Sequence, residues 1–194
     1  MQVLRSLLVG ILIFTIGVSL PASGSARQWR ASPSAQAQEY TQIIDQRSRT
    51  EVVFVWWIAP EIVDEQSPNA ERARAILREY MLVAVARANV SPLGQFTFDS
   101  ATSPLIQTPD GKARRPLAQR TLPPAVTAVV SMMQAVFSQA LGQFGQGVQW
   151  YVFDGKGIES CGKGALWVAY AGEQYGYATP IPGCRQSTAR SPGA

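Results

Sequence analysis

Three carboxylates near the C-terminus are the side chains best suited to catalysis: Asp154, Glu159 and Glu173. Two suitably spaced Asp or Glu side chains are sufficient for glycoside hydrolysis, and that chemistry needs no histidine. Asp154 begins an Asp-Gly turn signal and Glu173 follows a turn glycine, so both positions also fit ordinary turn chemistry. These three residues define one hypothesis, a small carboxylate-dependent hydrolase that acts on envelope polysaccharide.

Other catalytic chemistries lack the residues that they require. The chain has no histidine and only two cysteines, so we expect neither a histidine-based triad nor a zinc site. The Gly-Lys-Gly sequences at 155–157 and 162–164 neither open a helix nor have the order of a phosphate-binding loop. We therefore expect no metal and no cofactor, and we favour a protein that is not an enzyme.

The two cysteines, Cys161 and Cys184, are expected to form a disulfide bond. Their spacing excludes a C-x-x-C redox pair. They lie within residues 150–184, a segment with aromatic residues in quick succession and many turn glycines. This pattern predicts a C-terminal β-meander closed by the disulfide.

The aromatic residues of the meander support a binding hypothesis. Alternation along a strand places Tyr175 and Tyr177 on one face, and places Trp167 on the face opposite to Tyr170. Exposed rings on a rigid sheet can stack on sugars or anchor a peptide. The alternative is that these rings form cross-strand pairs that only stabilise the sheet.

The N-terminus has the organisation of an export signal. Residues 1–5 are a short positive region, residues 6–20 are apolar, and residues 21–26 are mostly small. We expect cleavage after Ala26 and a periplasmic or extracellular location. Two alternatives stay open: cleavage after Ala37, and retention of the leader as an uncleaved anchor. No membrane span is expected once the signal is removed.

Charge is concentrated outside the predicted domain, residues 40–184. The formal net charge of the whole chain is +4, but residues 40–184 contain 12 Lys and Arg against 12 Asp and Glu. A nucleic-acid-binding protein needs a basic surface that displaces counterions. We therefore exclude nucleic acid as a partner. Residues 27–39 are expected to be a flexible linker and residues 185–194 a disordered tail.

The order of predicted elements indicates an α+β fold. The elements are strand 51–59, helix 68–88, strands 95–99 and 105–108, helix 126–144 and strand 148–153. This order fits two helices packed on a mainly antiparallel sheet, as in a ferredoxin-like split βαβ arrangement. The meander would then extend the sheet or, alternatively, form a small sheet of its own.

Residues 122–153 carry no charge, so the polar side of helix 126–144 consists of Ser, Thr and Gln. That side either faces water or contacts a partner. Contact with a partner would be typical of an assembly protein. Our main hypothesis is a non-catalytic exported domain that binds an envelope protein or a glycan through Trp167, Tyr170, Tyr175 and Tyr177.

Overall fold

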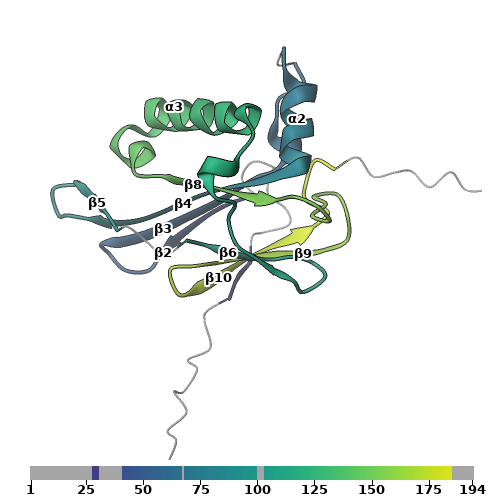
Figure 1. Ribbon diagram of the computed structural model, residues 1–194. Coiled ribbons are helices and arrows are strands. Elements are labelled where there is room, and N and C mark those ends of the chain that lie inside the picture. Colours follow the sequence, from purple (N-terminus) through teal and green to yellow (C-terminus); the bar gives the residue numbers. More distant parts are fainter. Residues whose placement is uncertain (1–27, 31–40, 67, 100–102, 185–194) are drawn as a thin grey trace, which may run out of the picture.

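The protein folds as an α+β sandwich of three layers (Figure 1). The computed structural model describes residues 28–30, 41–66, 68–99 and 103–184. Helices α2 (Ala70–Glu79) and α3 (Pro124–Gln146) cover one face of a five-stranded sheet, here sheet B. A second five-stranded sheet, sheet A, packs on its opposite face. The expected fold class, two helices on a mainly antiparallel sheet with a disulfide at the C-terminal end, is confirmed.

Sheet B has the order β2-β3-β4-β5. β8 also belongs to it and pairs with a different part of β4 than β5 does. Its strands are β2 (Gln42–Gln46), β3 (Glu51–Ile58), β4 (Tyr80–Val90), β5 (Phe96–Phe98) and β8 (Gln149–Asp154). All four pairings are antiparallel. The long strands β3 and β4 are buried on both faces, which explains why their sequences are apolar almost throughout.

Strand β4 corrects the expectation of a helix over residues 68–88. The helix ends at Glu79, and the chain continues directly as an 11-residue strand. The apolar residues that matched a helical pattern here belong to a strand that is buried on both sides. A continuous apolar run satisfies the helical and the extended template equally well.

The ferredoxin-like arrangement is not observed, because β3 and β4 are direct antiparallel neighbours across α2. A split βαβ unit requires the strands that flank the helix to run parallel with another strand between them. Asn89 of β4 lies opposite Glu51 at the start of β3, so the two strands pair along their length.

Sheet A has the order β1-β10-β9-β6-β7. Its strands are β1 (Gln28–Arg30), β6 (Leu105–Gln107), β7 (Ala113–Arg114), β9 (Gly164–Tyr170) and β10 (Glu173–Thr179). β1 runs parallel to β10 and covers the edge of that strand. This finding corrects the expectation that residues 27–39 are wholly a flexible linker; residues 31–40, the leader and the tail from residue 185 lie outside the described residues.

The predicted meander is divided between the two sheets. β8 belongs to sheet B, whereas β9 and β10 form an antiparallel hairpin in sheet A. The chain crosses from one sheet to the other after Asp154, and the short return strand expected at residues 158–161 does not form. β9 and β10 therefore neither extend sheet B nor form a sheet of their own, because they pair with β6 and β1 in sheet A.

The disulfide between Cys161 and Cys184 is present, with an S–S distance of 2.08 Å. It joins the segment that crosses between the sheets to the turn after β10. Backbone contacts strengthen the same junction, because the Ile181 N–H donates to the Ser160 carbonyl at 2.9 Å. A structural disulfide of this kind is consistent with an oxidising compartment.

Two apolar cores lie on the two sides of sheet B. Trp57 and its face of β3 pack against sheet A, while Trp56 faces α3, where its ring centroid lies 4.9 Å from that of Phe137. Both tryptophans are buried, as expected for a strand that is covered on two sides. Burial of such rings contributes strongly to stability.

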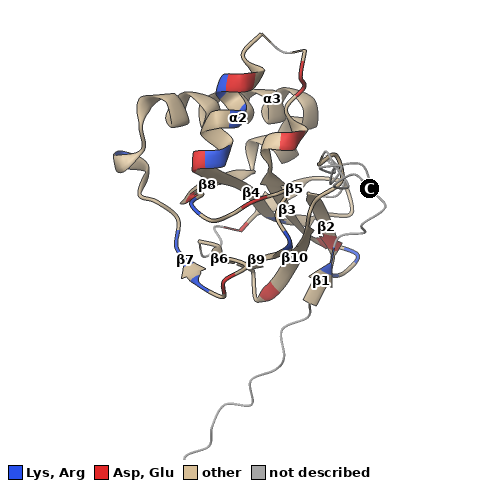
Figure 2. Cartoon of the chain, turned by 90° about the vertical axis from the view of Figure 1, so that its right-hand side faces the viewer, with Lys and Arg blue, Asp and Glu red and all other residues tan. Residues whose placement is uncertain are grey.

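Helix α3 lies on the outside of the sandwich and carries no charged residue (Figure 2). One side packs on sheet B through Val126 and Phe137, whereas Met132, Val136 and Leu141 remain exposed. With 23 residues it is long and apolar enough to cross a membrane, judged by length and composition alone. The expectation that the chain has no membrane span after signal removal stays a prediction.

Candidate functional site

Three of the four aromatic residues proposed for binding are buried between the two sheets. Tyr175 and Tyr177 have 0% exposure, and Tyr170 has 3%. The Tyr177 hydroxyl donates to the Val55 carbonyl at 3.2 Å, and its ring lies edge-on to Trp57. The predicted alternation is confirmed, but this face of the hairpin is the core face. These three rings are therefore not exposed to a ligand.

Trp167 is the one member of the set on the outer face of sheet A. It lies opposite Gly176 in the register of β9 and β10, and its ring covers that glycine closely. The Arg30 guanidinium lies 5.4 Å from the ring centroid, a cation–π contact between β1 and β9. Trp167 is half-buried by these neighbours.

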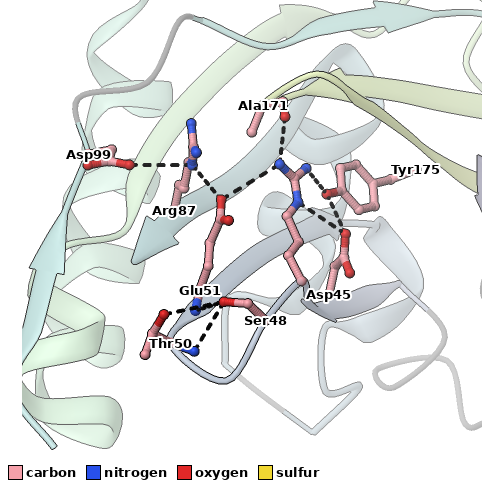
Figure 3. A network of polar contacts seen from close by, with 9 residues as sticks. Asp45, Ser48, Thr50, Glu51, Arg87, Asp99, Ala171 and Tyr175 are labelled. Atoms are coloured by element: carbon pink, nitrogen blue, oxygen red, sulfur yellow. Dashed lines mark hydrogen bonds and ion pairs between the residues drawn. The ribbon is translucent and has the colours of Figure 1, made fainter. Parts of the chain in front are cut away.

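A polar network joins the β2–β3 hairpin to the turn between β9 and β10 (Figure 3). The Arg47 guanidinium donates to the Ala171 carbonyl at 2.7 Å and to the Tyr175 hydroxyl at 2.8 Å. The Tyr175 hydroxyl donates to Asp45, whose side chain is fully buried. Glu51 lies between Arg47 and Arg87 and forms an ion pair with each. Because these contacts connect strands of both sheets, we assign the network a structural role.

The hydroxyl groups of Tyr170 and Tyr175 form a matched pair for a stability test. Tyr175 is bonded to Asp45 and Arg47, whereas the buried Tyr170 hydroxyl has no hydrogen-bond partner among the described residues. Tyr170→Phe should raise the free energy of unfolding by about 1 kcal/mol, because it removes an unsatisfied buried group. Tyr175→Phe should lower it by about 1–2 kcal/mol. Urea unfolding at neutral pH measures both changes, and equal effects of the two variants would contradict this assignment.

The dependence of stability on alkaline pH provides a second test of Tyr170 and Tyr175. Burial, with a further contribution from Tyr151, raises the pKa of Tyr170 from about 10 to about 12, and burial raises the pKa of Tyr175 as well. The folded state then keeps protons that the unfolded state loses, so stability is complete below pH 10 and falls as the pH rises toward 12. Each tyrosine can contribute up to about 1.4 kcal/mol per pH unit. Tyr170→Phe should make this decline shallower.

The three predicted carboxylates do not converge on one site. The side chain of Asp154 accepts a hydrogen bond from the Lys156 N–H at 3.0 Å, which is the expected turn contact. Glu173 begins β10, six residues before Thr179 at the other end of that strand, a separation of roughly 20 Å. Glu159 lies near that far end, next to Ser160, which is bonded to Ile181. Glu173 and Glu159 are therefore too far apart to act as a catalytic pair.

Glu159 does line a cavity of about 570 Å³ beside the disulfide, together with Glu61. Glu61 lies in the 3-10 turn η1 (Pro60–Ile62), directly after β3. Its Oε1 is 3.5 Å from the Cys161 sulfur, and its Oε2 is buried without a hydrogen-bond partner among the described residues. Sequence reasoning missed Glu61, because nothing local links it to a cysteine 100 residues further along the chain.

A cavity of about 640 Å³ lies between α3, residues 115–119 and the outer edge of β8. We name it the α3 cavity. Its lining includes Arg115, Thr127, Ser131, Gln134, Trp150 and Tyr151. No carboxylate lines it among the described residues, and Arg115 is the one charged side chain in the lining.

Rigid elements position the walls of the α3 cavity. The Leu117 N–H donates to the Val152 carbonyl at 2.7 Å, which ties residues 115–119 to the edge of β8. Trp150 packs edge-on to Phe137 of α3 with ring centroids 4.8 Å apart. Its indole N–H is buried without a hydrogen-bond partner in the described part of the chain. A preformed cavity with convergent polar groups is the usual form of a small-ligand site.

No family model, curated protein or solved structure matches the chain.

The residues of the α3 cavity had a partial signal in the sequence. Thr127, Ser131 and Gln134 belong to the uncharged polar side of the predicted helix, which was identified as a surface that faces either water or a partner. Trp150 had no signal of its own. Arg115 follows Arg114, the last residue of β7, which instead donates to the Asp154 and Lys156 carbonyls at 2.6 Å each.

Proposed function

We propose that the protein is an exported, non-catalytic domain that binds an envelope glycan in the α3 cavity. The observation that carries the proposal is the lining of this cavity by hydroxyl, amide and aromatic side chains with a single arginine. Sugars present many hydroxyl groups around apolar ring faces, so they match amide and hydroxyl groups placed beside indole and phenol rings.

The charge of the cavity supports binding rather than hydrolysis. Glycoside hydrolysis uses two carboxyl groups on either side of the scissile bond. The described lining of the α3 cavity contains no carboxyl group. Its Arg115 can form charge-assisted hydrogen bonds with an acidic sugar. The ligand class that fits best is an oligosaccharide that carries a carboxylate. The domain would bind it in the periplasm or outside the cell, after removal of the leader at Ala26.

The proposal moves the binding surface away from the C-terminal hairpin. Tyr170, Tyr175 and Tyr177 are buried, so of the original set only Trp167 has exposed surface that could contact a glycan. Its contacts with Arg30 and Gly176 explain its position without a ligand. Trp167 therefore serves as the comparison that decides between the two surfaces.

Two glutamines on α3 provide a direct test of the α3 cavity. Both are exposed, but Gln134 lines the cavity whereas Gln139 is outside the lining. Gln134→Ala should weaken the binding of soluble peptidoglycan fragments by about tenfold, because it removes one or two hydrogen bonds. Gln139→Ala should bind as the wild type does. Isothermal titration calorimetry measures the dissociation constants.

Other outcomes of the same experiment would overturn the proposal. Equal binding by wild type and Gln134→Ala would exclude the α3 cavity, and a loss restricted to Trp167→Ala would return the surface to sheet A. The alternative hydrolase is supported by the shared cavity of Glu61 and Glu159. New reducing ends that disappear in Glu159→Gln would favour that alternative over simple binding.

A further inference from the structure

The junction of η1 with the disulfide brings together three side chains that can ligate a metal ion. One ligand atom each from Glu61, Cys161 and Cys184 lies within 4.8 Å of the others. In the oxidised protein the two sulfurs are bonded to each other and hold no metal. We propose that, once this disulfide is reduced, Cys161, Cys184 and Glu61 form a zinc site.

The observed distances match a tetrahedral zinc site closely. Zn–S bonds of about 2.3 Å and a Zn–O bond of about 2.1 Å at tetrahedral angles place S and O about 3.6 Å apart. The contact between Glu61 Oε1 and the Cys161 sulfur is 3.5 Å. The two cysteine Cα atoms are 5.4 Å apart, so modest side-chain rotation can open the sulfurs to the about 3.8 Å that zinc requires.

Glu61 is held in place and lacks a competing partner. It lies in η1, close to the end of β3, and the Ile62 N–H donates to the Ala59 carbonyl at 3.2 Å, which fixes the turn. The buried Oε2 of Glu61 has no hydrogen-bond partner among the described residues. A buried carboxylate oxygen without a donor is unfavourable, and a cation would satisfy it.

The surroundings of the junction let a reductant reach the disulfide and place a positive charge beside the proposed zinc site. Cavities of about 570 and 380 Å³ adjoin the junction, and Glu61, Cys161 and Arg78 line both of them. Cys161 is exposed, so a dithiol reductant can reach it. Zinc with two thiolates and one carboxylate carries a net charge of −1, which the arginine in the lining opposes. Water would complete the fourth position.

A dithiol reduces the Cys161–Cys184 bond, giving two protein thiols and the oxidised, cyclic form of the dithiol. Binding of Zn²⁺ then releases one proton from each thiol, two in all, while the Glu61 carboxylate binds without proton release. Zinc is favoured over magnesium or calcium, because thiolate ligands select softer ions.

The expectation of no zinc site rested on the missing histidines and on the presence of only two cysteines. That reasoning left out carboxylates, which zinc accepts as ligands. The tertiary structure adds Glu61 from a distant segment, and reduction frees the sulfurs. The inference is independent of the α3 cavity, which shares no lining residue with this junction.

Zinc titration of the mature chain, with and without a dithiol, tests the proposal. Competition with a chromophoric chelator should show one Zn²⁺ bound per reduced chain with release of two protons, and none bound to the oxidised chain. Glu61→Gln should weaken binding by about tenfold or more. Glu65→Gln is the matched control, since Glu65 lines the smaller cavity but belongs to an ion pair with Arg74.

Cobalt in place of zinc gives a second readout. The reduced wild type should show the thiolate-to-cobalt absorption of a tetrahedral site, and Cys161→Ser should abolish it. Equal zinc binding by the oxidised and reduced chains would overturn the proposal, as would equal affinity of wild type and Glu61→Gln. If reduction unfolds the chain, zinc must restore the near-UV circular dichroism, and failure to do so would also overturn it.

Discussion

Replacement of Asp45 with alanine is expected to lower the free energy of unfolding by about 4 kcal/mol. Asp45 is fully buried in β2 and accepts hydrogen bonds from Tyr175 at 3.1 Å and from Arg47 at 3.4 Å (Figure 3). Without this carboxylate, the partly buried Arg47 loses its nearest counter-charge. Removing one partner of a buried ion pair strongly destabilises the folded state, because the remaining charge stays desolvated.

Denaturant unfolding of Asp45→Ala measures this loss, and Glu51→Ala is its control. Glu51 belongs to the same network but is more exposed, and its ion pairs with Arg47 and Arg87 lie near the surface. Exposed ion pairs contribute about 1 kcal/mol or less. If the two variants lost equal stability, burial of Asp45 would not be the cause. A double variant with Arg47→Ala would show how strongly the pair is coupled.

Removal of the disulfide by Cys161→Ala should lower the free energy of unfolding by about 3 kcal/mol. The bond closes a loop across a sequence separation of 23 residues and holds the chain where it crosses between the sheets. The cross-link restricts the unfolded chain, so its loss stabilises the unfolded state. For a domain of this size the melting temperature should fall by roughly 6–12 °C.

The helices should survive this change, since α2 and α3 pack on sheet B through contacts that do not involve the cysteines. Far-UV circular dichroism at low temperature should therefore match the wild type. The double variant Cys161→Ala, Cys184→Ala controls for the thiol left free by the single change and should lose the same stability. An unchanged melting temperature in both variants would show that the disulfide adds nothing to stability.

Local sequence patterns predicted the elements whose structure depends on neighbouring residues. β3 was expected from its β-branched and aromatic run, α3 from its helical spacing, and the β9–β10 hairpin from alternation with turn glycines. The turn between β9 and β10 is formed by Ala171 and Gly172, which both have positive φ. Two such residues form the tight turn that suits a hairpin.

The same patterns were ambiguous where an element is buried on both sides. β4 matched a helix because each of its faces is covered, one by sheet A and the other by the helices. Burial of both faces removes the alternation of apolar and polar residues that identifies a strand. For the same reason alternation placed Tyr175 and Tyr177 on one face correctly, but could not tell whether that face was core or surface.

The sequence by itself determined the α+β class, the pairing of Cys161 with Cys184, the absence of histidine chemistry and the neutral charge of the domain. Only the tertiary structure decided which strands share a sheet, which aromatic rings are buried, and which distant residues meet. Glu61 reaches Cys161, and Arg115 joins Gln134 and Trp150, through strand pairing and helix packing over long separations. Such contacts depend on the free energy of the whole chain, and no local spacing encodes them.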